Sequence, residues 1–161
     1  MGARAEAIAK KFEARVDEAT AVFERLSDAD WKKVTAAEKW PVGVTAHHVA
    51  MAHQGIGGLL KNVADGKASG PATFQMSALD EMNAQHAREF ANCTKAETIA
   101  LHKQNAAAAA AMVRALSDEQ LDRTGNFLVG LPSMTAEQVA TGILINHIDD
   151  HLGSIRKTVG G

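Results

Sequence analysis

The sequence predicts an all-α fold, a bundle of four long helices with an additional short helical segment. Apolar residues recur at spacings of three and four along most of the 161-residue chain, which is the period of an amphipathic helix. No segment shows the alternating pattern of a strand, and aromatic residues make up only 4% of the chain. The length fits a single domain, residues 1–161, that can bury a core of its own.

The first half of the chain predicts two long helices. The second is expected from about Val42 to Asp65, since Pro41 suits a helix start and Gly66 a helix end. Residues 27–30, Ser-Asp-Ala-Asp, offer a cap before the irregular stretch that separates the two helices. The first helix covers residues 5–26, where eight apolar side chains share one face: Ala5, Ile8, Phe12, Val16, Ala19, Val22, Phe23 and Leu26.

A third helix is expected over residues 77–91 and a fourth from Thr94 to about Leu116. Residues 94–97, Thr-Lys-Ala-Glu, form a capping-box sequence, which marks a helix start. Asn92-Cys93 is therefore interpreted as the joint between the two helices, although one kinked continuous helix is an alternative. Residues 117–134 are expected to be rich in loops.

The last helix, residues 135–158 with Thr135 as its cap, contains two histidines four residues apart. In an α-helix such positions lie roughly 40° apart on one face, so His147 and His151 can point at one divalent cation. Both adjoin the apolar arc of the helix instead of its solvent face. Asp150 lies beside the histidine edge and is a candidate to orient a ligand or accept a proton.

His48 is the candidate third ligand, because apolar and small residues of the second helix lie within roughly 60° of it on a helical wheel. On the same reasoning His47 and His53 are less favourably placed, although His47 could serve at a boundary, and His86 and His102 are expected to be solvated. Three inward histidines from two helices would bind a metal through neutral imidazoles and leave positions open, as catalytic sites do.

Gly55 lies two turns along the face of His48, and a glycine inside a helix costs about 1 kcal/mol relative to alanine. We expect Gly55 to leave room for a ligand above the metal. Three imidazoles suit zinc, nickel, iron or copper, and zinc or nickel is expected first.

Composition excludes several classes of partner. A formal net charge of −2 and a pI of about 6.4, without a run of like charges, argue against nucleic acid and anionic membrane surfaces. No apolar run reaches the length of a membrane span. The single cysteine, Cys93, excludes an internal disulfide and favours a reducing compartment, so a cytoplasmic location is expected.

Two segments resemble a known family. Residues 40–50, Trp-Pro-Val-Gly-Val-Thr-Ala-His-His-Val-Ala, and residues 147–156, His-Ile-Asp-Asp-His-Leu-Gly-Ser-Ile-Arg, resemble the helix opening and the C-terminal signature of the DinB-like superfamily. That superfamily includes bacillithiol S-transferases and is related to the metal-binding domain of mycothiol-dependent maleylpyruvate isomerase. In those isomerases the first residue of the last pair can be glutamate, so His147 favours the DinB side.

The resemblance implies that His48, eight residues after Trp40, forms a metal triad with His147 and His151. It also implies homodimers and a DinB-like four-helix bundle. The leading hypothesis is a metal-dependent transferase that joins a low-molecular-weight thiol to an electrophilic small-molecule substrate. Two alternatives stay open: a small hydrolase that uses metal-bound water, and a non-catalytic bundle that binds a metal or ligand.

Overall fold

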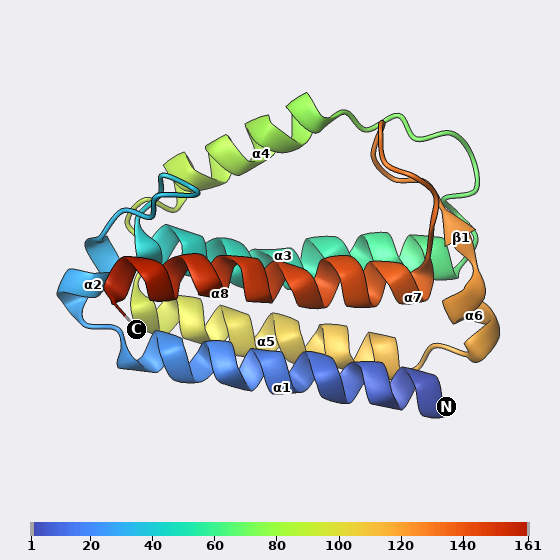
Figure 1. Cartoon of the computed structure of the whole chain (residues 1–161), viewed down its shortest axis with the longest axis horizontal. Coiled ribbons are helices and arrows are strands. Elements are labelled where there is room, and N and C mark those ends of the chain that lie inside the picture. Colours follow the sequence, from blue (N-terminus) through green and yellow to red (C-terminus); the bar gives the residue numbers. More distant parts are fainter. Residues whose placement is uncertain (1, 161) are drawn as a thin grey trace.

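Four long helical stretches lie side by side in the computed structural model, which describes residues 2–160 (Figure 1). They are α1 (Ala3–Arg25), α3 (Val42–Ala64), α5 (Lys95–Arg114) and a last stretch from Ala136 to Val159. The predicted all-α bundle is therefore confirmed. Within the described range, no helix is both long and apolar enough to cross a membrane.

The core lies between these four stretches and follows the predicted apolar faces. All the residues of α1 that are buried come from the three-and-four pattern of its sequence, with Ala9 in addition. α3 is buried around most of its circumference, because it packs on α5 on one side and on the last helical stretch on another. α5 contributes small side chains, among them Ala106, Ala109 and Ala110, which allow the helices to approach closely.

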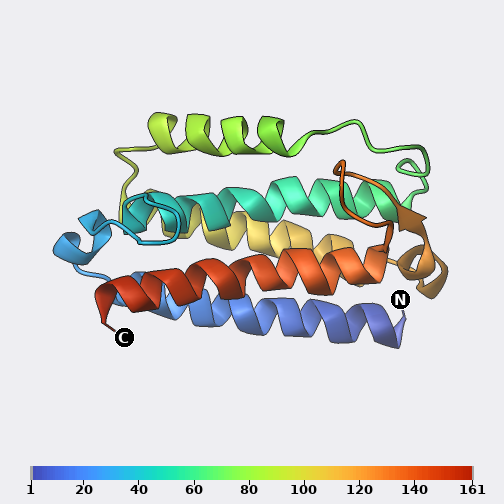
Figure 2. The same cartoon turned by 45° about the horizontal axis from the view of Figure 1, so that its top comes forward.

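The additional helix is α4 (Met76–Glu89), which runs along the outside of the bundle beside α3 (Figures 1 and 2). None of its residues is buried. α4 and α5 are separate helices, so the alternative of one kinked helix is wrong. Thr94 caps α5 as predicted, since its hydroxyl accepts a hydrogen bond from the backbone N–H of Glu97 at 3.2 Å.

Four short elements lie where loops were expected. The helices α2 (Asp28–Lys32) and α6 (Asp118–Asp122) each begin with a reciprocal serine capping box. The strands β1 (Thr124–Gly125) and β2 (Met134–Thr135) form a two-residue antiparallel pair, a small exception to the prediction of no strands. The sequence analysis predicted a cap at residues 27–30 but did not predict the short helix α2 that begins there.

The last helical stretch is divided into α7 (Ala136–Val139), a π-helical segment η1 (Ala140–Ile145) and α8 (Asn146–Val159). Thr135 caps α7 as predicted, with its hydroxyl accepting from the N–H of Gln138 at 3.0 Å. The π segment was not predicted. Because it ends before residue 146, both histidines of the C-terminal pair lie in α8 and keep their α-helical spacing.

Candidate metal centre

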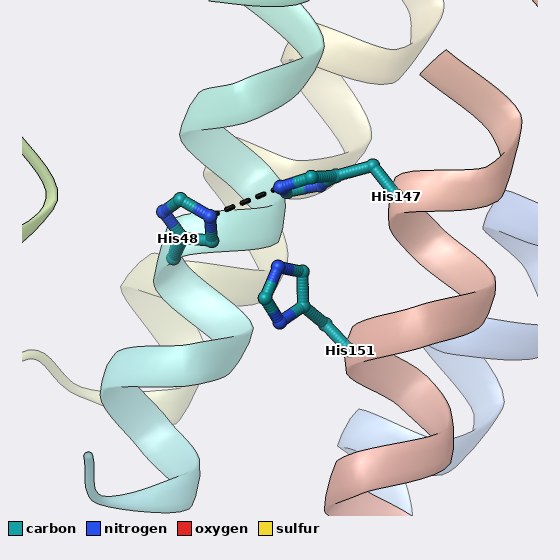
Figure 3. Close-up of side chains that lie close together, drawn as sticks. All are labelled: His48, His147 and His151. Atoms are coloured by element: carbon teal, nitrogen blue, oxygen red, sulfur yellow. Dashed lines mark hydrogen bonds between the residues drawn. The ribbon is translucent and has the colours of Figure 1, made fainter. Parts of the chain in front are cut away.

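The structure brings together the three predicted ligands, His48 from α3 and His147 and His151 from α8 (Figure 3). One ring nitrogen of each histidine lies within 4.8 Å of the others, and Nε2 of His48 is 3.0 Å from Nε2 of His147. Two nitrogens bound to one tetrahedral zinc ion at ~2.0–2.1 Å are roughly 3.4 Å apart. The spacing of the ring nitrogens therefore fits a single divalent cation.

The chemistry of the donor set fits as well. Burial, together with the neighbouring imidazoles, lowers the pKa of both His48 and His147 to about 3. Both rings are therefore neutral at pH 7, and a neutral imidazole has one ring nitrogen with a free lone pair. Three histidine rings supply three ligands and leave further coordination positions for a substrate or solvent molecule.

Glu38 fixes the orientation of the His151 ring. Its Oε1 lies 2.8 Å from Nδ1 of His151, and its Oε2 accepts a hydrogen bond from the Ser154 hydroxyl at 2.6 Å. Burial alone would raise the pKa of Glu38, but the polar groups around its carboxylate, Ser154 first and then Thr35 and His151, outweigh burial and hold that pKa below its usual range. The carboxylate is thus ionised, Nδ1–H of His151 donates to it, and Nε2 stays available for a metal.

A tight turn between α2 and α3 delivers Glu38 to this position. The turn is closed by backbone hydrogen bonds from Thr35 to Trp40 at 2.9 Å and from Lys39 to Thr35 at 3.1 Å. Lys39 takes the left-handed conformation, with φ of 62°, which reverses the chain. The Trp40 ring then meets the His48 ring edge-on at 5.2 Å between ring centres.

Asp150 does not make the orienting contact predicted for it. Its side chain is exposed, and its carboxylate accepts a hydrogen bond from Asn146 at 3.3 Å. The carboxylate beside His151 is instead Glu38, which comes from a different element and so was invisible to a helical wheel of α8. A role of Asp150 in proton transfer stays a prediction.

Gly55 is exposed on α3, and a Cβ atom added to it would meet no atom within 4 Å. This open space is what the predicted role requires, although binding of a ligand at Gly55 also stays a prediction.

The other four histidines lie outside this group of three. The prediction that His86 and His102 are solvated was wrong, since His86 is half-buried. His47 and His53 are buried, and so is His102, which was expected to be solvated. His53 pairs with His102 across α3 and α5 at 3.0 Å, and His47 pairs with His86 of α4 at 2.8 Å. A wheel assigns one buried face to a helix, whereas α3 has neighbours on several sides, so its histidines are covered in several directions.

Comparison with known proteins agrees with this architecture. The family model described as DinB superfamily matches residues 11–155, which include the three histidines and Glu38. No curated protein matches the chain significantly.

Proposed function

The chain belongs to the DinB superfamily, and from this premise we propose that it is a metal-dependent transferase that joins a low-molecular-weight thiol to an electrophilic small molecule. The observation that carries the proposal is the group of three imidazoles whose ring nitrogens lie within 4.8 Å of one another, held by two helices and able to leave coordination positions open. The choice of a thiol as the cosubstrate comes from the family resemblance and not from the geometry of the site.

His48, His147 and His151 would hold the cation, and zinc or nickel is the expected ion. When bound, such a cation lowers the pKa of a thiol, so that the sulfur is a nucleophile at neutral pH. Glu38 keeps the His151 ring in the tautomer that presents Nε2. In the transfer, the sulfur forms a bond to a substrate carbon, the leaving group departs with the electron pair of the broken bond, and the thiol proton passes to solvent.

The test is a reaction of the zinc- or nickel-loaded protein with an aryl halide in the presence of bacillithiol, mycothiol or glutathione. We expect formation of the thioether to depend on both the metal and one of these thiols, and to be lost in His151→Ala. Lys10→Ala, an exposed change on α1, is the matched control and should keep full activity.

Absence of thioether with all three thiols would contradict the transferase. Hydrolysis of an electrophilic ester or amide without any thiol would instead support the hydrolase alternative, in which water is the nucleophile.

A further inference from the structure

α4 is fastened to the bundle through one histidine. Among the side-chain hydrogen bonds and ion pairs of residues 2–160, only that of His86 joins α4 to another element, from its Nε2 to Nδ1 of His47 at 2.8 Å. Phe90, just after α4, stacks on the His47 ring at 4.1 Å and lies 5.0 Å from the His86 ring. The His86 ring is therefore held by its hydrogen bond to His47 and by its contact with Phe90.

This fixed ring also lies against the metal centre. The His86 and His48 rings meet edge-on, with 5.7 Å between their centres and 66° between their planes. Imidazole pairs in this protein that are joined by a hydrogen bond have ring centres 4.8, 4.9 and 5.0 Å apart. A small shift of α4 would bring His86 to the same separation from His48.

One ring nitrogen of each of these two histidines makes no hydrogen bond to another group of residues 2–160. Nδ1 of His86 is buried and makes no hydrogen bond. Nε2 of His48 points at His147, and its Nδ1 lies on the opposite side of the ring, where no hydrogen bond joins it to any group of residues 2–160 (Figure 3). A histidine that binds a metal through Nε2 normally donates its Nδ1–H to a second group, as His151 does to Glu38.

We propose that His86 is a positioning residue of the metal centre, whose Nδ1 accepts a hydrogen bond from Nδ1–H of His48 when His48 holds a cation through Nε2. The inference rests on the proposed metal centre and adds α4 to it. The hydrogen positions are consistent: His48 donates to His86, and Nε2–H of His86 donates to Nδ1 of His47, with one hydrogen on each ring.

Two substitutions separate this contact from the attachment of α4. The amide of a glutamine reaches the position of Nε2 and can keep the bond to His47, whereas that of an asparagine reaches the position of Nδ1 and can accept from His48. Zinc affinity is measured on the full chain by competition with a chromophoric chelator. We expect His86→Gln to bind zinc about 10- to 100-fold more weakly, the usual effect of losing a partner of a metal ligand. His86→Asn and Met82→Ala, an exposed change on α4, should bind like the wild type.

The absorption spectrum of the cobalt-loaded protein gives a second measurement that does not depend on turnover. It should change in His86→Gln, because the His48 ring is free to rotate, and not in His86→Asn. Wild-type zinc affinity in His86→Gln, or equal losses in the two variants, would overturn the role of His86 while leaving the metal centre intact. Absence of zinc and cobalt uptake by the wild type would instead overturn the centre itself.

Discussion

The three ligands of the candidate centre are supported unequally by their surroundings. His151 donates to Glu38, a carboxylate that Ser154 also holds and that is only 9% exposed. His48 and His147 face one another through their Nε2 atoms and depend on burial to stay neutral. The residue whose loss should be felt most, apart from the ligands themselves, is therefore Glu38.

Replacing Glu38 by glutamine should lower zinc affinity by about 10- to 100-fold, because the amide is neutral and holds the His151 tautomer less strongly. Calorimetric titration of zinc into the metal-free protein measures the change. Glu119→Gln, on a side chain that is 83% exposed, should leave the affinity unchanged. Equal affinity in Glu38→Gln and the wild type would show that Glu38 does not support the ligand.

Two glycines of α3 should respond to alanine substitution with stability changes of opposite sign. Gly55→Ala should keep or raise stability by up to about 1 kcal/mol, since the new Cβ meets open space and alanine favours a helix. Gly43→Ala should lower it by about 1–3 kcal/mol, because its Cβ would lie 2.3 Å from the Trp31 indole. Urea unfolding measures both changes. A loss of stability in Gly55→Ala would mean that the space above it is not free.

The three candidate ligands could be predicted from the sequence, because a spacing of four residues within one α-helix and an apolar face around His48 are both visible in a short stretch of sequence. Glu38 could not, since it reaches His151 from a turn with no periodicity and over 113 positions of sequence. The buried pair of His53 and His102 was missed for a related reason. Only the three-dimensional packing of α1, α3 and α5 covers both rings.

At the scale of elements, the π-helical segment decides the geometry at the end of the chain. A π turn takes up more residues than an α turn, so η1 rotates the faces of α7 relative to those of α8. The sequence of residues 140–145, Ala-Thr-Gly-Ile-Leu-Ile, gives no local sign of this widening. The prediction of a helix over residues 135–158 was right in its extent. The rotation of its faces at the π segment could not be predicted from the sequence.

The contact between α3 and α5 contains a pH-sensitive pair, His53 and His102, which lies against Phe12 and Phe23. Burial lowers the pKa of His53 to about 3, and burial also lowers that of His102. The folded state therefore stays unprotonated where the unfolded chain binds protons, below a pKa of about 6.5. The free energy of unfolding should fall as the pH drops from about 6.5 towards 3.

This pair's share of the pH dependence is measured with a double variant, His53→Leu with His102→Leu, compared with the wild type by urea unfolding at several pH values. Each histidine contributes a slope of up to about 1.4 kcal/mol per pH unit. The double variant should lose that slope between pH 6 and 4. Identical slopes in the two proteins would show that the pair does not titrate on unfolding.

At the scale of the molecule, the helical bundle could be predicted from the sequence, but the identity of the helices that form its core could not. The sequence contains five candidate helices, and nothing in their spacing says that α5, with its alanines, enters the core while α4 stays outside. The reason is physical: small side chains stabilise close helix packing through the many contacts that they permit, which is a property of the assembled bundle.

Occupancy of the centre should stabilise the whole chain, because its ligands come from α3 and α8, which are separated by about a hundred residues of sequence. A ligand that binds only the folded state adds about 2.7 kcal/mol at 100 times its dissociation constant. We expect the Tm to rise with zinc in scanning calorimetry. The double variant His147→Ala with His151→Ala should show no rise, and an equal rise in both proteins would place the zinc elsewhere.

The contact of Trp40 with His48 gives the chain an optical reporter of its own. The protein has two tryptophans and no tyrosine, so Trp31→Phe leaves a single indole, which lies against the candidate ligand His48. A paramagnetic ion such as Ni²⁺ or Cu²⁺ held by His48 should quench the emission of Trp40, whereas Zn²⁺ should not. The brightness of one residue can then follow the arrival, exchange and loss of the metal in real time, without any label.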